Sequence, residues 1–136
     1  MLQAYSSNLT VAANAAYPFN NVVIDKGCAE TLAAPASIQL NKRGVYLVEV
    51  DGFGTAAAAG DGSTQLAVNG VLQPQAICQY TATSDGISNF GFKTFVQVAE
   101  NNCQCNCVSS PTVLQVVNGD AALTDAHINV VVTKIC

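Results

Sequence analysis

Apolar residues recur along this chain in short runs about ten residues apart, and turn residues separate the runs, a spacing typical of strands in an antiparallel sandwich or barrel. No sequence repeat and no linker divides the 136 residues, so we expect one domain. The runs that we expect to form strands span residues 9–13, 19–24, 36–40, 45–53, 64–68, 71–83, 87–98, 112–117 and 127–135.

Two short segments between the runs predict the connections between strands. Asn69-Gly70 joins two of the runs directly, and this dipeptide is the strongest short signal for a β-hairpin. The alanine-rich segment 56–60 is too short for a helix and has glycine on both sides, so we expect it to form a loop.

Two of the predicted strands are apolar on both faces, although a strand in a sheet with one wet face should alternate cleanly. We therefore expect a second cover over these strands, either from another subunit, which we favour, or from a loop folded over the sheet. The opposed sets are Tyr46, Val48 and Val50 against Val45 and Leu47, and Ile128, Val130 and Val132 against Val131 and Ile135.

Composition and charge argue against two classes of partner, nucleic acids and membranes. Half of the residues are hydrophobic and only 10% are charged, with a net charge of −4, and the only adjacent basic pair is Lys42-Arg43. Nucleic-acid binding needs clustered cations, so we expect no nucleic-acid partner. No apolar stretch is long enough for a membrane helix, so we expect no membrane partner. The first ten residues lack the basic and apolar regions of a secretory signal, which predicts synthesis in a cytoplasm.

Four segments resemble the bacterial and phage type of the C1q/TNF-like jelly-roll superfamily, as found in spore-surface proteins and in phage virion fibre or decoration proteins. The segments are "YPFNNVVIDKG" (17–27), "IQLNKRGVYLVEVDGFG" (38–54), "TQLAVNGVLQPQAIC" (64–78) and "INVVVTKI" (128–135). They are apolar strands and turns rather than catalytic motifs. The resemblance spans nearly the whole chain and is more specific for fold than for activity.

The resemblance implies an all-β, antiparallel jelly-roll sandwich of two sheets that forms a homotrimer around a three-fold axis. Residues 15–136 would form the jelly roll, and residues 1–14 an N-terminal strand or an anchoring arm. It also implies a module that binds or decorates rather than catalyses, with no cofactor. Candidates for the trimer interface are apolar residues of the long strands: Tyr46, Val48, Phe92, Phe95, Val130 and Val132.

Catalytic and metal chemistry has little support in the sequence. A pair of His127 with a cysteine is formally possible, but a lone histidine on a strand is more often a hydrogen-bonded sheet residue. The nine carboxylates show no spacing typical of an acid–base pair. Asp51 and Asp61 are an alternative calcium site without the ordered spacing of a dedicated loop. We therefore expect a protein that is not an enzyme and binds no metal.

Three cysteines, Cys103, Cys105 and Cys107, are each separated by one residue, whereas zinc sites favour a separation of two to four. In an extended chain their Cα atoms would lie roughly 6.6 Å apart at ~3.3 Å per residue, at the outer limit for a disulfide between neighbours. A partner elsewhere in the chain is therefore favoured. A metal cluster of the three cysteines remains an alternative. A redox centre is less favoured, because no basic residue lies nearby in sequence to lower the pKa of a thiol.

The implied fold suggests one disulfide partner for the three clustered cysteines. Strands 87–98 and 127–135 would both run antiparallel to strand 45–53 and finish at the same end of the sheet. We therefore predict a disulfide from Cys136 to one of the three clustered cysteines. A second bridge through Cys28 or Cys78, or across to a neighbouring subunit, stays open.

These observations predict a trimeric surface protein of a particle, first of all a phage virion, as a head fibre, a decoration protein or a tail-fibre tip. Its partners would be its own copies and other virion or particle-surface proteins. A bacterial spore-surface (exosporium) protein is an alternative. Another is an adhesin module that binds a host-surface glycan or receptor through exposed aromatic residues, for which the candidates are Tyr17, Phe53 and Tyr80.

Overall fold

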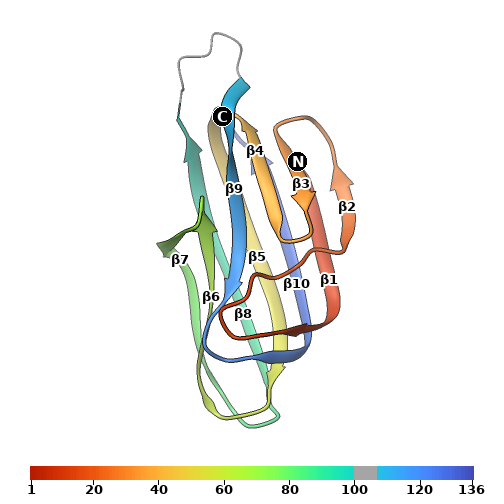
Figure 1. The fold of residues 1–136 in the computed structure, drawn as a ribbon, viewed down its shortest axis with the longest axis vertical. Helices are drawn as coiled ribbons and strands as arrows, with labels where there is room; N and C mark the ends of the chain where they lie inside the picture. The colour runs from red at the N-terminus through yellow and green to blue at the C-terminus, as the bar shows by residue number, and fades with distance from the viewer. Residues whose placement is uncertain (100–106) are drawn as a thin grey trace.

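The chain folds as two antiparallel five-stranded sheets packed face to face, in a computed structural model that describes residues 1–99 and 107–136, without the side chains of 107–109 (Figure 1). Sheet A has the order β2-β1-β10-β5-β8, and sheet B has the order β3-β4-β9-β6-β7. Sheet A contains β1 (Leu2–Val11), β2 (Asn21–Asp25), β5 (Gly44–Ala56), β8 (Ile87–Val98) and β10 (Leu123–Lys134). Sheet B contains β3 (Glu30–Ala34), β4 (Ser37–Lys42), β6 (Gly60–Val68), β7 (Val71–Ala82) and β9 (Cys107–Asn118).

This architecture confirms the expected all-β jelly-roll sandwich of two antiparallel sheets. The hairpin at Asn69-Gly70 joins β6 to β7, and both residues adopt the positive φ angles (51° and 80°) that its tight turn requires. The alanine-rich segment connects β5 to β6 as a loop, as expected. None of the described residues forms a helix that is long and apolar enough to cross a membrane.

The first strand is part of sheet A. β1 pairs with β10 on one side and with β2 on the other, and Leu2 and Ala4 are fully buried. Residues 2–11 therefore lie in the sandwich as a strand. The sequence pattern predicted only the end of this strand, because Ser6, which is also fully buried, interrupts the apolar alternation.

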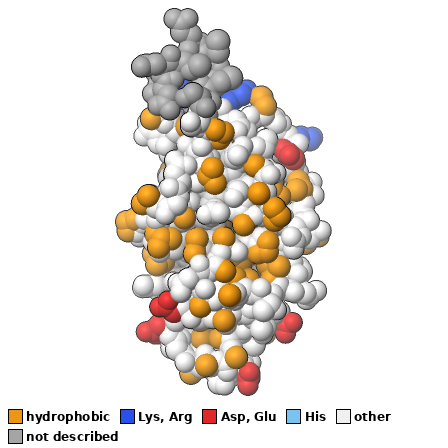
Figure 2. Space-filling model, viewed as in Figure 1, with side chains coloured by type: hydrophobic (Ala, Val, Ile, Leu, Met, Phe, Trp, Pro, Cys, Tyr) orange, Lys and Arg blue, Asp and Glu red, His pale blue; other side chains and the backbone are white. Residues whose placement is uncertain are grey.

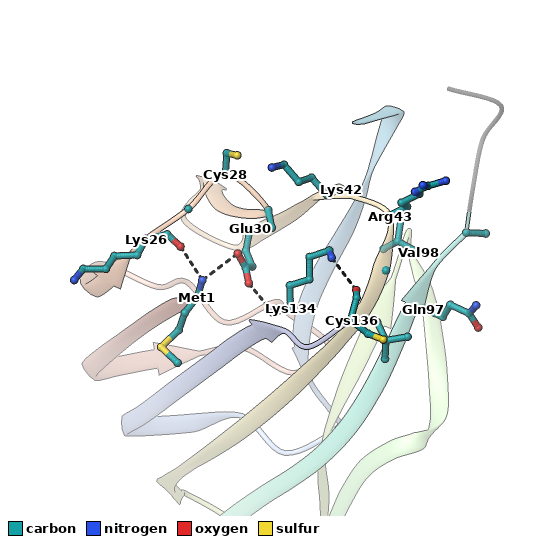
Figure 3. Close-up of a pocket in the computed structure, with 15 residues that line it drawn as sticks. Met1, Lys26, Cys28, Glu30, Lys42, Arg43, Gln97, Val98, Lys134 and Cys136 are labelled. Atoms are coloured by element: carbon teal, nitrogen blue, oxygen red, sulfur yellow. Dashed lines mark hydrogen bonds and ion pairs between the residues drawn. The ribbon is translucent and has the colours of Figure 1, made fainter. Parts of the chain in front are cut away.

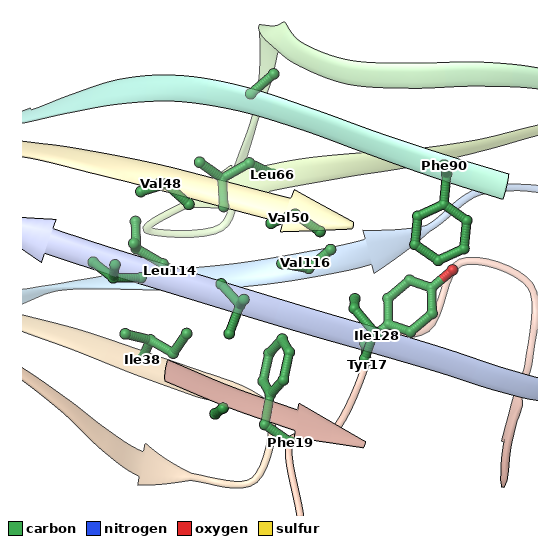
Figure 4. Packing of buried hydrophobic residues seen from close by; sticks show 14 of the residues in the cluster. Tyr17, Phe19, Ile38, Val48, Val50, Leu66, Phe90, Leu114, Val116 and Ile128 are labelled. Atoms are coloured by element: carbon green, nitrogen blue, oxygen red, sulfur yellow. The ribbon is translucent and has the colours of Figure 1, made fainter. Parts of the chain in front are cut away.

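The core lies between the two sheets and follows the alternation of the strands. Val48, Val50 and Ile128 of sheet A face Leu66, Leu114 and Val116 of sheet B (Figure 4). The opposite residues of the same strands, such as Val45, Leu47 and Val131, point to the outer face of sheet A and are only partly buried. Both faces of these strands are thus apolar, as the sequence predicted, and the inner face is covered by sheet B.

Four of the six candidates for the trimer interface are in the wrong place for that role. Their side chains point between the sheets and are 0% exposed, so they cannot line an axis between subunits: Tyr46, Val48, Val130 and Val132. Phe92 is half-buried against the same core. Phe95 points outward from β8 and is 61% exposed. Of the six candidates, only Phe95 is therefore available to another subunit.

Candidate functional site

Four of the chain's five lysine and arginine residues line one pocket at the end of the sandwich where β4, β8 and β10 finish. They are Lys26, Lys42, Arg43 and Lys134, and we call this end the basic end (Figure 3). The pocket has a volume of about 720 Å³. Separate strand ends supply the cations: Lys26 follows β2, Lys42 ends β4 and is followed by Arg43, and Lys134 ends β10. Lys26, the Lys42-Arg43 pair and Lys134 are far apart in sequence but line one pocket in the fold, so sequence spacing understated their clustering. The absence of a nucleic-acid partner stays a prediction.

A buried carboxylate joins three parts of the chain that line this pocket. Glu30 is 1% exposed, and its Oε1 accepts a hydrogen bond from the Lys134 backbone N–H at 2.9 Å. Its Oε2 accepts from the Met1 amino group at 3.2 Å, and the same amino group donates to the Lys26 carbonyl at 2.8 Å. Glu30 on β3 thus ties sheet B to β1 and β10 of sheet A, as buried charges require a partner.

The close approach of strand ends at the pocket depends on a glycine. Gly44 has φ +140°, and a Cβ there would collide with the Cys136 carbonyl oxygen and the Lys134 side chain. The Lys134 Nζ donates to that carbonyl at 2.7 Å. A larger residue at position 44 would therefore displace the end of β10 from the pocket.

Three of the described cysteine positions lie near the same end. Cys28 and Cys136 line the pocket and are exposed, and the backbone of Cys107 pairs with Lys42 at the start of β9. β8 and β10 both run antiparallel to β5 and finish beside the pocket, which confirms the placement from which the Cys136 disulfide was predicted.

The disulfide itself stays a prediction. Cys103 and Cys105 lie outside the described residues, as does the side chain of Cys107, so the proposed metal cluster of these three also falls outside them. Cys28, Cys78 and Cys136 are free thiols in the described structure. Cys78 lies on β7, half-buried against the core and away from the pocket.

The outer face of sheet A carries a row of three rings. The His127 ring stacks on Phe53 with centroids 5.4 Å apart and lies 6.0 Å from the ring of Tyr5. Ser7 Oγ lies 2.9 Å from His127 Nδ1, so His127 is a hydrogen-bonded sheet residue. Phe53 is 42% exposed and is available for a ligand.

The other two aromatic candidates for glycan binding are placed differently. Tyr17 is 0% exposed, so the structure contradicts its role as a surface contact. Its hydroxyl donates to Asn118 Oδ1 at 3.3 Å and shares a hydrogen bond with Thr64, and burial raises the pKa of Tyr17 well above its usual value. Tyr80 is half-buried and stacks on Phe90, and burial also raises the pKa of its hydroxyl.

The end opposite the basic end carries carboxylates on its turns. Four aspartates lie there, and we call it the acidic end: Asp61, Asp85, Asp120 and Asp125. Asp61 and Asp120 line a polar pocket beside Tyr80. Asp51 instead points outward from β5 in sheet A, where Asn129 Nδ2 donates to its carboxylate at 3.2 Å. The structure therefore does not bring Asp51 and Asp61 together, and no group of three metal-ligating side chains occurs among the described residues.

Comparisons with known proteins identify the fold. No protein-family model matches the chain, and no curated protein matches it. Among solved structures, PRD1 vertex protein P5 aligns over 99% of this chain and 96% of its own, with 20% identity and a TM-score of 0.63. The globular domain of zebrafish complement 1qA aligns over 96% and 94%, with 11% identity and a TM-score of 0.65. Eiger TNF from S. frugiperda aligns over 98% and 92%, with 18% identity and a TM-score of 0.59. The fold is therefore a C1q/TNF-like jelly roll.

Proposed function

We propose that this chain is a non-enzymatic module on the surface of a phage virion, where it acts as a homotrimer in a head fibre, a decoration protein or a tail-fibre tip. The observation that carries the proposal is the end-to-end structural likeness to PRD1 vertex protein P5, a protein whose name places it at a vertex. The likeness covers both chains almost completely, so it supports a role for the whole chain rather than for one part of it.

The trimer has support in the outer face of sheet A. Phe95 is 61% exposed there and pairs across β5 and β8 with the partly buried Leu47, and Phe53 is 42% exposed further along β5. Exposed aromatic residues favour burial against another subunit, because aromatic side chains are enriched in the buried parts of interfaces. We therefore propose this face, with Phe95 in place of the four core residues, as the surface that meets neighbouring copies.

A matched pair of variants tests this surface. Phe95→Glu on sheet A should convert the trimer to single chains. Leu72→Glu on β7 of sheet B, where the side chain is 51% exposed, should leave the trimer intact. Both sites are exposed in the single chain, so neither change should unfold it. Light scattering on the two purified variants distinguishes the faces, and loss of the trimer in Leu72→Glu alone would move the interface to sheet B.

The virion role is tested on particles. An antibody raised against the purified chain should label intact virions from its source, and the chain should sediment with them through a density gradient. Recovery of the chain only in the particle-free fraction would contradict a virion protein. Labelling of spores instead would favour the spore-surface alternative.

A second candidate, a glycan- or receptor-binding adhesin, is favoured by the exposed Phe53, whose ring stacks on the partly buried His127. Polar side chains lie on the same face, where Gln3 donates to Asn129 and Asn129 donates to Asp51. A glycan-array signal that is lost in Phe53→Ala and retained in Leu72→Ala would support this function. Glycan binding at this site would also require the part of sheet A around Phe53 to stay exposed to solvent in the trimer.

A further inference from the structure

The polar pocket beside Tyr80 lies on β6 and β7 of sheet B, near the acidic end, and we call it the sheet B pocket. Its volume is about 470 Å³, within the range of roughly 300–1,000 Å³ that is typical of ligand pockets in proteins. Two aspartates, two hydroxyl residues and a glutamine contribute polar side chains to it: Asp61, Asp120, Ser63, Thr81 and Gln79. The pocket lies on the opposite sheet from the surface proposed for the trimer.

Strand pairing places four of these side chains together. Asp61 lies opposite Thr81, and Ser63 lies opposite Gln79, across β6 and β7. Because Thr64 is fully buried, the alternation of a strand directs Asp61 and Ser63 to the outer face of the sheet. Opposite residues lie roughly 5 Å apart, and alternate residues along a strand lie about 6.6 Å apart. The four side chains therefore surround an area comparable to one six-membered sugar ring.

The backbone around the pocket is held in place on both sides. β6 and β7 pair without interruption over residues 60–65. The Gly119 N–H donates to the Ser63 carbonyl at 2.8 Å, and the Gly119 carbonyl accepts from the Asn14 N–H at 2.9 Å. A Cβ at Gly119 would collide with Ser63 Oγ, so this close approach brings the turn that carries Asp120 against β6. The pocket is therefore formed before a ligand arrives, which lowers the entropic cost of binding.

The five polar side chains of the pocket are available to a ligand. Among the described residues, none of them has a hydrogen-bond or ion-pair partner for its side chain. A ligand can therefore bond to them without breaking a bond within the protein. Ionised carboxylates only accept hydrogen bonds, whereas hydroxyl and amide groups both donate and accept. The pocket thus offers a mixed set of acceptors and donors.

Charge and bonding capacity together select the class of ligand. No lysine or arginine lines the pocket, so its two carboxylates would repel an anion. In Figure 2, which shows the sheet B side of the molecule, the blue side chains lie near one end of the visible face, and red ones gather toward the other. An ammonium group only donates, and it would leave the donors of the pocket unused. Sugar hydroxyls both donate and accept, so a neutral sugar matches the whole set.

We propose that the sheet B pocket binds a neutral saccharide, with one sugar ring over the paired strands. The carboxylates of Asp61 and Asp120 accept hydrogen bonds from the sugar hydroxyls, and the Gln79 amide donates to them. A single ring makes few contacts, so binding to one chain is weak, and several linked copies would strengthen it. This inference goes beyond the proposed function, because it requires neither a virion nor a trimer and lies on the sheet opposite Phe53.

The test records amide NMR spectra of the full chain during addition of the methyl glycosides of glucose, galactose, mannose and N-acetylglucosamine, one at a time. We expect at least one sugar to cause saturable shifts at residues 61–63, 79–81 and 120, and EDTA to leave these shifts unchanged. The absence of such shifts with every sugar, up to its solubility limit, overturns the proposal. Shifts at these residues with calcium alone, and with no sugar, overturn it in favour of a cation site.

Matched variants test the named contacts. Asp61→Ala should weaken sugar binding about tenfold or more, because it removes a charged acceptor, and Gln79→Ala should weaken it several-fold. Gln75→Ala on the same strand and Asp25→Ala at the end of β2 are the controls and should bind as the wild type does. All four side chains are exposed, so no variant should unfold. Wild-type affinity in Asp61→Ala would overturn the proposed site.

Phe53→Ala separates this site from the aromatic residues on sheet A. The variant should keep the shifts at the sheet B pocket, because Phe53 lies on the other sheet. Sugar binding that is lost in Phe53→Ala and kept in Asp61→Ala would overturn the proposal in favour of a sugar site on sheet A. Native mass is measured on the same samples. A single chain that binds sugar would refute the trimer alone, and a trimer that binds no sugar would refute this inference alone.

Discussion

The acidic end and the basic end of this sandwich are held together by different chemistry. At the acidic end, neutral groups close the core: Tyr17 bonds to Asn118 and Thr64, and Asn118 Nδ2 donates to the carbonyls of Ala12 and Ala121 at 3.1 and 2.8 Å. At the basic end, several strands end around a pocket, and the buried carboxylate of Glu30 joins these strand ends. The comparison shows that neutral hydrogen bonds close the core at the acidic end, whereas a buried carboxylate joins the strand ends beside the pocket at the basic end.

The largest expected effect on stability is at the acidic end. Tyr17→Ala should lower the free energy of unfolding by about 3–5 kcal/mol, because it removes a fully buried aromatic ring and leaves a cavity. Tyr5→Ala on the outer face of sheet A is the matched control and should cost less than about 2 kcal/mol. Urea unfolding measures both. Equal losses would mean that Tyr17 does not close the core.

A smaller effect is expected at the basic end. Glu30→Ala should cost about 1–3 kcal/mol, because it leaves the Lys134 N–H without its acceptor. The ion pair with Met1 adds little, since the amino group is 51% exposed and solvent screens it. Glu30→Gln keeps an amide oxygen for the Lys134 N–H and should recover most of the loss. A glutamine variant as unstable as the alanine variant would show that the charge matters more than the hydrogen bond.

Alkaline pH should weaken both ends of the sandwich, because Tyr17 and Tyr80 lie near the acidic end and the Tyr46 hydroxyl donates to the Lys42 carbonyl at the basic end. Burial raises the pKa of Tyr17, Tyr46 and Tyr80 above the usual value of about 10, so the folded state disfavours their ionised forms. Their contribution to stability is complete below pH of about 10 and is lost as the pH rises through the higher folded values. Tyrosinate absorbance followed with circular dichroism should show these residues ionising together with unfolding. Ionisation of all tyrosines near pH 10 in a folded protein would contradict this.

The smallest expected effect is at Tyr80, beside the polar pocket of the acidic end. Its Oη is buried and has no hydrogen-bond partner among the described residues. Tyr80→Phe should therefore change the free energy of unfolding by less than about 1 kcal/mol, in either direction, because it removes an unsatisfied polar atom and keeps the ring on Phe90. A loss well above that in thermal unfolding would reveal a partner for this hydroxyl.

Much of the fold could be predicted from the strand pattern, because alternation and the Asn69-Gly70 turn are local signals. β3 was missed, since Glu30–Ala34 contains little of the β-branched and aromatic character that marks strands. The two faces of β5 and β10 could not be told apart, because both are apolar, and four residues of the core were consequently predicted at the trimer interface. Tyr17 precedes a proline in a connection, and nothing in its local sequence indicates burial.

The candidate site was less predictable, for a physical reason. The basic end is assembled from the ends of β2, β4 and β10, and only the strand order brings its cations together. The placement of Cys136 beside the end of β8 was predictable, because antiparallel pairing to β5 fixes where both strands finish. Residue spacing alone carries no such information for Lys26 and Lys134.

The native mass in solution, measured by light scattering at about 500 mM salt with and without reductant, tests the central claim most directly, because charge contacts are screened there. The account predicts a mass of three chains in both conditions, with the outer face of sheet A buried between subunits. A trimer that dissociates on reduction would place cysteines across the interface. A mass of one chain in both conditions would contradict the trimeric surface module.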